Sequence, residues 1–175
     1  LILLFFASAS ISEGKKPYIE SVSVETNSRD VIISAMLKNG LTRDIIEAIN
    51  SGLTTTFNFH LELKSERFFW FDMDVLSRTI KHSVKYNPVL KEYTFISQDD
   101  RGENSRVTQD FGLVTQWMQT LNHIHLIPLS ILEPERRYYI RIKAEMESSS
   151  LLIPLTRLLF FVSFGNHQLS KLPSS

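Results

Sequence analysis

Hydrophobic and polar residues alternate along much of the chain, which is the spacing of β-strands with one buried face. The longest such stretch covers residues 53–64. Its two sets are apolar Leu53, Phe57, Phe59, Leu61 and Leu63, and polar Thr54, Thr56, Asn58, His60, Glu62 and Lys64. Because one set faces a core and the other faces water, the pattern predicts an antiparallel strand with His60 pointing to solvent.

The same alternation predicts further strands near both ends of this stretch. The residues expected to face the core are Tyr18, Val22 and Val24 in one, Val31, Ile33, Ala35 and Leu37 in the next, and Tyr138, Ile140, Ile142, Ala144 and Met146 in the last. Asn87-Pro88 marks a turn, after which residues 90–97 are expected to return as a partner strand. The polar stretch SQDDRGENS, residues 97–105, predicts a loop.

Two segments have helical instead of alternating spacing. Leu41, Ile45 and Ile49 predict a short helix that Thr42 can cap and that ends near Gly52. The second helix is expected from about Thr108 to Asn122, with an apolar face of Phe111, Val114, Met118 and Leu121. Together these elements predict a mainly β fold (β-rich α+β), an antiparallel sandwich or strongly bent sheet with two helices. A single domain is expected over residues 18–164, followed by a polar tail at 165–175.

The run RFFWFDMD, residues 67–74, changes this pattern within one strand. Apolar residues occupy the odd positions Phe69, Phe71, Met73 and Val75, and the even positions from Leu76 onward. A shift of one residue is what a β-bulge produces, so a bulge is predicted between Val75 and Leu76. Phe69, Phe71 and Met73 are then expected to be mostly buried. Asp72 is expected to accept hydrogen bonds from backbone donors freed at the bulge.

Composition excludes several classes of protein. The 175 residues include 19 basic and 19 acidic residues, so the basic footprint of a nucleic-acid-binding protein is missing. There is no cysteine, which excludes disulfides, thiolate nucleophiles and zinc-thiolate sites. Residues 151–164, LLIPLTRLLFFVSF, are shorter than the roughly 20 apolar residues of a spanning helix. No transmembrane span is therefore expected in the mature chain.

The first ten residues, LILLFFASAS, match the end of a secretory signal peptide. An apolar run precedes the small residues Ala7-Ser8-Ala9, with cleavage expected near Ala9 or Ser10. We therefore interpret residues 1–10 as a truncated signal peptide, which predicts export to the periplasm or cell envelope. The alternatives are an apolar first strand and an uncleaved anchor.

Two short motifs suggest metal chemistry. Asp72-Met73-Asp74 resembles the Asp-x-Asp that holds a divalent cation, and His123-x-His125 can present two imidazoles on one side of an extended segment. Each supplies only two ligands, so a solvated strand face and a histidine pair at a helix end are the favoured interpretations. No metal, no cofactor and no catalytic residue is predicted, and no Gly-x-Ser-x-Gly motif supports a hydrolase serine.

Aromatic residues offer a possible binding face. Phe68 and Trp70, beside Asp72, could form a groove with Tyr138 and Tyr139 for an apolar ligand or a protein partner. The sequence therefore predicts these five residues as the candidate binding site. Core packing is the favoured interpretation for the aromatic side chains, because large aromatics dominate protein cores.

The stretch RFFWFDMDVLSRTIKHSVKYNPVLKEYTF, together with LEPERRYYIRIKAEME, resembles exported proteobacterial proteins catalogued as domain of unknown function 4390. The resemblance covers about residues 18–164 and implies an envelope protein linked to envelope signalling, with no established activity to transfer. It departs at the C-terminal end, where GNHQLSKLPSS replaces an aromatic-containing strand.

The sequence thus predicts a non-catalytic envelope module that binds a protein partner or an apolar ligand. A metal-assisted enzyme using Asp72 and Asp74, or His123 and His125, is one alternative. A purely structural envelope protein is the other.

Overall fold

The computed structural model describes residues 15–66, 72–148 and 167–168, which form two antiparallel β-sheets packed face to face. The smaller sheet has the order β1-β2-β7. Its strands are β1 (Tyr18–Thr26), β2 (Asp30–Lys38) and β7 (Thr120–Pro128). The larger sheet has the order β6-β5-β4-β3-β8-β9. Its strands are β3 (Thr55–Ser65), β4 (Met73–Asn87), β5 (Glu92–Asp99), β6 (Gly102–Thr108), β8 (Tyr138–Ser148) and β9 (His167–Gln168). The predicted mainly β, antiparallel fold is confirmed.

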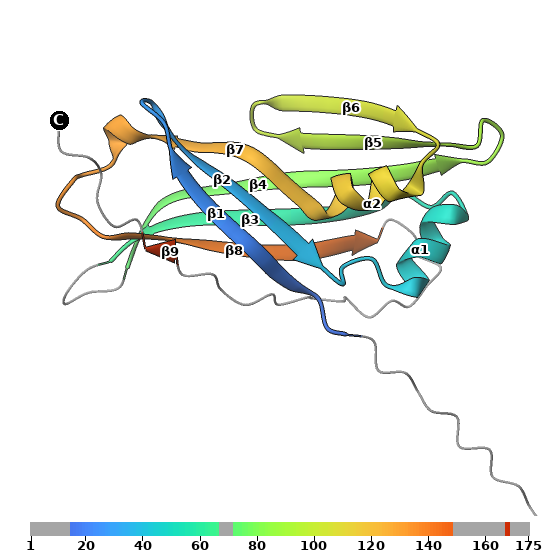
Figure 1. Cartoon of the computed structure of the whole chain (residues 1–175), viewed down its shortest axis with the longest axis horizontal. Helices are drawn as coiled ribbons and strands as arrows, with labels where there is room; N and C mark the ends of the chain where they lie inside the picture. The colour runs from blue at the N-terminus through green and yellow to red at the C-terminus, as the bar shows by residue number, and fades with distance from the viewer. Residues whose placement is uncertain (1–14, 67–71, 149–166, 169–175) are drawn as a thin grey trace, which may run out of the picture.

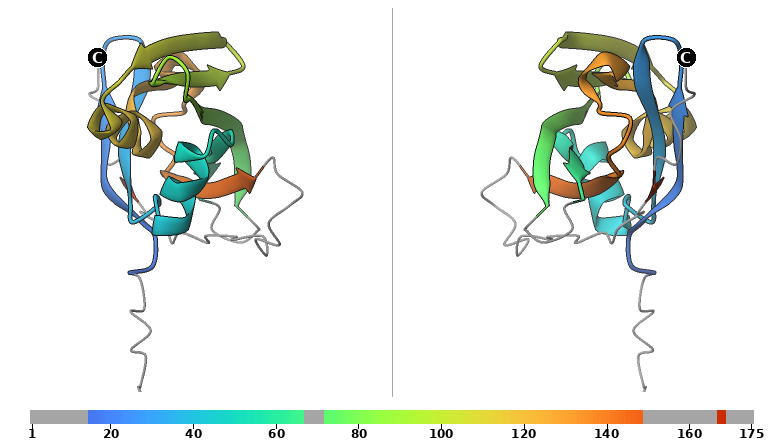
Figure 2. Two further views of the ribbon diagram at one scale, coloured as in Figure 1. Left: turned by 90° about the vertical axis from the view of Figure 1, so that its right-hand side faces the viewer. Right: turned by 90° about the vertical axis from the view of Figure 1, so that its left-hand side faces the viewer.

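The hydrophobic core lies between the two sheets. Figure 1 shows β1 and β2 running diagonally across the larger sheet, and Figure 2 shows the two layers from the ends. Every second residue of β2, β3 and β8 faces this interior, as the alternation predicts. The buried members include Val31, Ile33, Ala35 and Leu37 of β2, Phe57, Phe59, Leu61 and Leu63 of β3, and Ile140, Ile142 and Ala144 of β8.

Both predicted helices are present: α1 (Arg43–Asn50) and α2 (Phe111–Gln119). Thr42 occupies the N-cap of α1, although its side chain makes no capping hydrogen bond. Gly52, with φ of 87°, ends α1, and the N–H of Leu53 donates to the carbonyl of Ala48. These are the features of a Schellman motif, in which glycine accepts the left-handed backbone without strain. A 3₁₀ turn, η1 (Leu129–Ile131), follows β7.

Helix α2 is shorter than predicted at both ends. The Asp110 side chain accepts a hydrogen bond from the N–H of Gly112, so the helix begins after this cap and not at Thr108. At Thr120 the backbone becomes extended and the chain enters β7. Leu121 is therefore buried as part of a strand, because pairing with β2 outweighs its helical spacing from Met118.

The bulge predicted near the start of β4 is confirmed. Leu63 pairs with Leu76 and Lys64 pairs with Asp74, so Val75 is the extra residue. The predicted burial of Met73 is wrong, because 37% of it is exposed. Met73 pairs with Ser65 as the first residue of β4, at the end of the sheet where neighbours cover it incompletely. Phe69 and Phe71 lie outside the described residues.

The first strand contains an irregularity that the alternation does not predict. Ser21 has a φ of 54°, and the pairing between β1 and β2 shifts between Glu20 and Ser23. Ile19 therefore packs against the core together with Val22 and Val24, whereas Tyr18 is 45% exposed. The prediction that Tyr18 shares the inward face of Val22 and Val24 is wrong, because the bulge between them reverses which side of the sheet each side chain faces.

The polar stretch 97–105 is a β-hairpin and not a loop. Its first residues finish β5, and β6 returns in continuous register from Gly102 opposite Asp99 to Thr108 opposite Tyr93. Polar residues occupy β6 because it lies at the margin of the larger sheet. At the opposite margin, His167 and Gln168 of the predicted polar tail pair with β8.

Candidate binding site beneath the second helix

Helix α2 rests on the inner side of the larger sheet through aromatic contacts. The Phe111 ring centroid lies 5.5 Å from that of Tyr93, and the Trp117 centroid lies 5.6 Å from that of Phe95. Val114 and Met118 are fully buried on the same helix. These contacts hold the indole of Trp117 over β5, at the end of α2 where the chain turns into β7.

A partly open pocket of about 250 Å³ lies beside Trp117. Its lining comes from β4, β5, β6, α2 and β7, and includes His82, Phe95, Ser97, Arg106, Gln116, Trp117 and Asn122. Pockets that enclose drug-sized ligands usually measure roughly 300–1,000 Å³. The volume therefore fits a small molecule or one or two side chains of a partner. Aromatic surface combined with amide, hydroxyl and guanidinium groups suits an amphipathic occupant.

His82 is the buried polar residue of this pocket, at 4% exposure. Its ring packs edge-on against Phe59 at 5.1 Å and Phe95 at 5.2 Å between centroids. Burial lowers the pKa of His82 to about 4; the backbone carbonyls of Met118 and Trp117 oppose this shift, and the charge of Arg106 adds to it. The imidazole is therefore neutral at pH 7. Because a carbonyl can only accept, Nδ1 carries the proton and donates to the Met118 oxygen at 3.4 Å.

Arg106 is the cation of the pocket. It lies opposite Phe95 on the inner face of β6, with its guanidinium carbon 5.5 Å from the centroid of Trp117. This is cation–π geometry. Within the described part of the chain, the guanidinium forms no ion pair with a carboxylate. An anionic group entering the pocket would therefore meet a positive charge that no carboxylate of the described residues neutralises.

Ser97 and His82 are directly opposite each other on neighbouring strands, which invites comparison with a serine–histidine dyad. A pKa of about 4 makes the imidazole a weak base at neutral pH. Its Nδ1 faces a backbone carbonyl, not the carboxylate that orients a catalytic histidine. The arrangement thus favours binding over nucleophilic catalysis.

A second buried polar residue, Arg78, joins the two sheets near this site. Its Nε and one terminal nitrogen contact Asp100 and Asp99, each at 2.6 Å, and the other terminal nitrogen donates to the carbonyl of His125 at 2.6 Å. Sequence reasoning missed both Arg78 and His82. The sequence did contain a sign of their burial, because both occupy even positions of β4, on the same inward face as Leu76 and Ile80.

The residues that the sequence singled out are only partly brought together. The Tyr139 hydroxyl donates to Asp72 at 2.6 Å, which raises the pKa of this phenol. The predicted role of Asp72 is corrected, because a tyrosine hydroxyl and not a backbone group at the bulge is its donor. Tyr138 is buried, and its hydroxyl accepts from the N–H of Glu133 at 2.8 Å. Tyr138 and Tyr139 therefore face opposite sides of the sheet and cannot line one groove.

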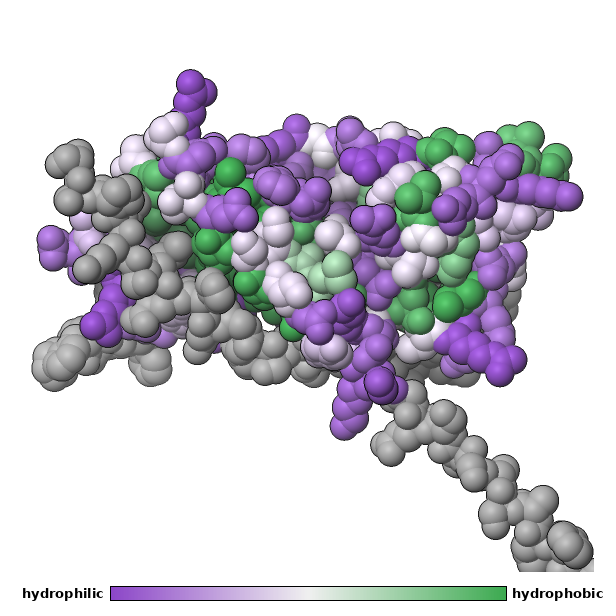
Figure 3. All heavy atoms as spheres, in the orientation of Figure 1, coloured by the Kyte–Doolittle hydropathy of each residue, from purple (hydrophilic) through white to green (hydrophobic). Residues whose placement is uncertain are grey.

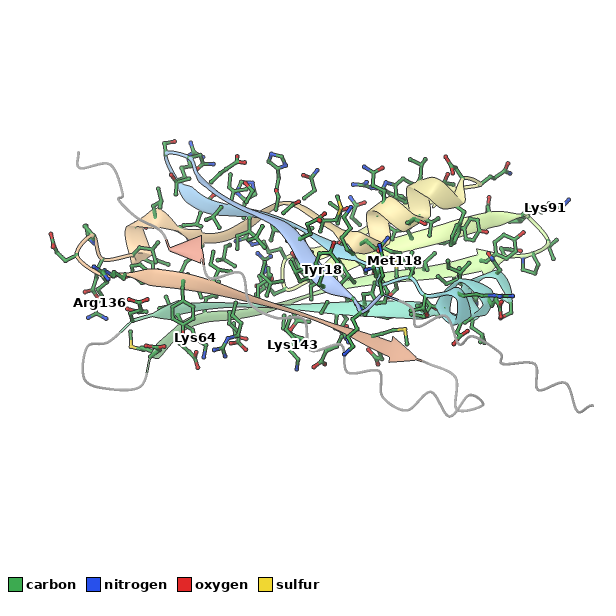
Figure 4. All side chains as sticks on the ribbon, turned by 60° about the horizontal axis from the view of Figure 1, so that its bottom comes forward. Tyr18, Lys64, Lys91, Met118, Arg136 and Lys143 are labelled. Atoms are coloured by element: carbon green, nitrogen blue, oxygen red, sulfur yellow. The ribbon has the colours of Figure 1, made fainter. Side chains whose placement is uncertain are left out.

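Phe68 and Trp70 lie outside the described residues. Asp74 pairs with Lys64 at 2.7 Å, and this hydrogen bond raises the pKa of the lysine. Lys143 pairs with Glu145, which lowers the pKa of that carboxyl. Figure 4 shows Lys64 and Lys143 on one side of the larger sheet and Met118 on the other. This outer face is a solvated surface of paired charges.

The two histidines of the predicted pair have separate partners. His123 has a φ of 51°, and its Nδ1 lies 2.7 Å from the Asn122 side-chain oxygen. Nδ1 of His125 lies 3.0 Å from a carboxylate oxygen of Asp30. Nowhere in residues 15–66, 72–148 and 167–168 do three or more His, Asp or Glu side chains cluster as metal ligands. Neither helix in this part of the chain has the length and apolar character needed to cross a bilayer.

The surface seen in Figure 3 is mostly hydrophilic, with small hydrophobic patches. One lies at the tip of the β4–β5 hairpin, where Val89 and Leu90 are exposed. The pocket, by contrast, is lined in part by the exposed polar residues Gln116 and Asn122. The pocket is therefore distinguished by mixed chemistry and not by a broad apolar surface.

A protein-family model described as "Domain of unknown function (DUF4390)" matches residues 15–170. No curated protein and no solved structure matches the chain. The matched range includes both sheets, both helices and every residue that lines the pocket.

Proposed function

The chain belongs to the family described as a domain of unknown function (DUF4390), and we propose that it is a non-catalytic binding module of the periplasm or cell envelope. The pocket beneath α2 is its binding site, for an apolar or amphipathic ligand or for a segment of a protein partner. The observation that carries this proposal is the position of Trp117 and Arg106 around an accessible 250 Å³ pocket.

The chemistry of the pocket supports binding over catalysis. A neutral His82, held by a backbone carbonyl, is a hydrogen-bonding group of fixed tautomer and a poor general base. Trp117 offers an aromatic face, and Arg106 offers a positive charge. Groups of this kind orient a bound molecule through stacking and a few directed polar contacts.

The envelope location is supported by the apolar run and small residues of LILLFFASAS. Secretion of the chain with a complete upstream signal sequence should give a periplasmic protein that begins near Ser10. N-terminal sequencing measures this directly. Recovery of the intact terminus from the cytoplasm would contradict export. The link to envelope signalling rests on the resemblance of the sequence alone.

Two alternatives make different predictions. A metal-assisted enzyme would require Asp72 and Asp74, or His123 and His125, to recruit further ligands. A chelator is expected to leave the thermal midpoint unchanged, and a large fall that zinc reverses would support the metal alternative. A purely structural envelope protein would carry no occupant in the pocket under any condition.

The direct test is native mass spectrometry of protein recovered gently from the periplasm. We expect additional bound mass, or a co-purifying protein, with the wild type. Trp117→Leu and Arg106→Gln should each reduce this occupancy. Leu113→Ala is the matched control, because Leu113 lies on the same helix, is exposed and does not line the pocket. Equal occupancy in all four proteins would contradict the assignment of the site.

A further inference from the structure

The described residues form four sheet margins, and they differ in regularity. The free edge of β1 is interrupted at Ser21, and β7 shifts its pairing with β2 at two places. β9 is only two residues long. β6 is the one of these four that combines an uninterrupted pairing with a length of 7 residues.

β6 lacks the proline, the lysine and the bulge that commonly protect an edge strand, and its one inward-pointing charge is Arg106. Such a charge discourages an added strand unless that strand brings a charge of opposite sign. Natural edges are commonly blunted by proline, by lysine or by a bulge, since unpaired N–H and C=O groups otherwise attract another strand. The sequence of β6, GENSRVT, contains neither proline nor lysine, and all of its residues from Gly102 to Val107 are exposed. Figures 1 and 2 show β6 at the rim of the larger sheet, where no strand of the described residues lies beyond it.

The pocket reaches this edge strand through Arg106, on the inner face of the sheet. Arg106 projects from β6 to the Trp117 ring and contributes to the pocket lining. The neighbouring residue Val107 lies on the opposite face and is 56% exposed. In an added strand, successive side chains would alternate between these two faces. One set would meet the Arg106 cation and the pocket, and the other set would meet Val107.

We propose that β6 is the docking edge for an extended peptide segment of a partner protein, which adds as a further strand and places an acidic side chain against Arg106. This inference rests on the proposed function and identifies the occupant of the same pocket. The peptide has acidic residues at inward positions and aliphatic residues at outward positions. Main-chain hydrogen bonds to β6 supply affinity, and the pocket supplies specificity, as in other cases of strand addition.

A second copy of the chain fits this edge less well. If two β6 strands pair with their inner faces on the same side, each presents inward Gly102, Asn104, Arg106 and Thr108. None of these side chains is acidic. Each Arg106 would then face a strand whose inward side chains include no carboxylate, and in a register that placed the two Arg106 residues opposite each other the like charges would be unfavourable.

The probe is a soluble, capped peptide as long as β6, with glutamate and valine at alternate positions and threonine at both ends. Calorimetric titration measures its Kd, and amide hydrogen exchange locates the contact. We expect slower exchange at alternate residues of β6, because every second N–H points away from β5. We also expect binding to be roughly tenfold weaker when glutamine replaces glutamate in the peptide.

Matched variants separate charge from shape. Arg106→Gln should weaken binding of the glutamate peptide roughly tenfold and leave binding of the glutamine peptide nearly unchanged, since the two changes remove the same interaction. Arg101→Gln is the control, because Arg101 is an exposed arginine in the turn before β6 and does not line the pocket. Two isomers of the peptide carry N-methyl groups on alternate sets of backbone amides, so that each isomer has one of its two hydrogen-bonding edges blocked. Only the isomer whose free edge faces β6 should bind.

Several outcomes would overturn the inference. Peptide binding without slower exchange in β6 excludes strand addition, as does equal binding of both N-methylated isomers. Concentration-dependent protection of β6 without peptide makes a second copy the occupant. A small molecule found in the pocket by native mass spectrometry, with unchanged exchange in β6, contradicts the peptide and leaves the proposed function standing. If native mass spectrometry finds no occupant and the peptide does not bind, both the proposed function and the docking of a peptide are contradicted.

Discussion

His82 links the stability of the fold to pH, because its imidazole is buried and neutral in the folded chain and exposed in the unfolded chain. Burial lowers its pKa from 6.5 to about 4. Between these two values the unfolded chain binds a proton that the folded chain does not. The stability that a neutral, buried His82 provides is therefore fully present above pH 6.5 and is lost as the pH falls toward 4.

The size of this effect follows from the two pKa values. One proton of difference changes the free energy of unfolding by about 1.4 kcal/mol per pH unit. From pH 7 to pH 5 the loss is about 2 kcal/mol, since the unfolded imidazole is only partly protonated at the upper end of this range. The pKa of Glu145 is lowered by Lys143, so the stability that this carboxylate contributes is lost only at more acidic pH, below its ordinary value of 4.5.

The assay is urea denaturation followed by circular dichroism at several pH values from 7 to 5. His82→Leu removes the titrating group, so its free energy of unfolding should vary by less than about 0.5 kcal/mol over this range. His123→Asn is the control, because it removes an exposed histidine at a positive φ that asparagine tolerates. If His82→Leu keeps the full pH dependence of the wild type, the assignment of a buried, neutral His82 is wrong.

Further predictions concern the core, the buried cation and the outer face. Phe59→Ala should lower the free energy of unfolding by about 3–5 kcal/mol in a denaturant titration, because Phe59 is buried in the core against the ring of His82. Arg78→Ala should cost about 3 kcal/mol, since it leaves Asp99, Asp100 and the His125 carbonyl without their buried donor. Arg43→Ala, at an exposed helical pair, should cost less than about 0.5 kcal/mol. A small effect for Arg78→Ala would show that the cluster is dispensable. Asp72→Asn should lower the pKa of the Tyr139 phenol toward 10, because the carboxylate that accepts its proton is removed. The titration of Tyr139 is obtained by subtracting the ultraviolet pH titration of Tyr139→Phe from that of the parent, and an unchanged pKa in Asp72→Asn would contradict the hydrogen bond.

Local spacing was sufficient to predict most of the elements. In β3 and β8 every second residue is apolar, so the buried face could be assigned without knowing the neighbouring strands. The bulge at Val75 was also visible, because one inserted residue reverses the apolar phase of the strand. Helix α1 was predictable through Ile45, Ile49 and Gly52, since spacing and C-terminal capping are both local.

The buried polar residues could not be predicted in the same way. Arg78 and His82 occupy inward positions of β4 that alternation alone reserves for apolar side chains. Their acceptors come from distant segments: Arg78 donates to the His125 carbonyl 47 residues away, and His82 contacts the Met118 carbonyl 36 residues away. A buried polar group is stable only when such a partner is in place, and tertiary packing alone supplies it.

The sequence by itself determined the β-rich class, the inward faces of the main strands, the bulge and the two helices, because these depend on contacts between near neighbours and on side-chain period. Only the tertiary structure decided that the polar stretch 97–105 contributes an edge strand, since polarity alone does not distinguish an exposed strand from a loop. Only the tertiary structure brought Trp117, Arg106 and His82 together around one pocket. These three residues come from a helix and two strands that do not pair with each other, so their proximity depends on how the elements pack.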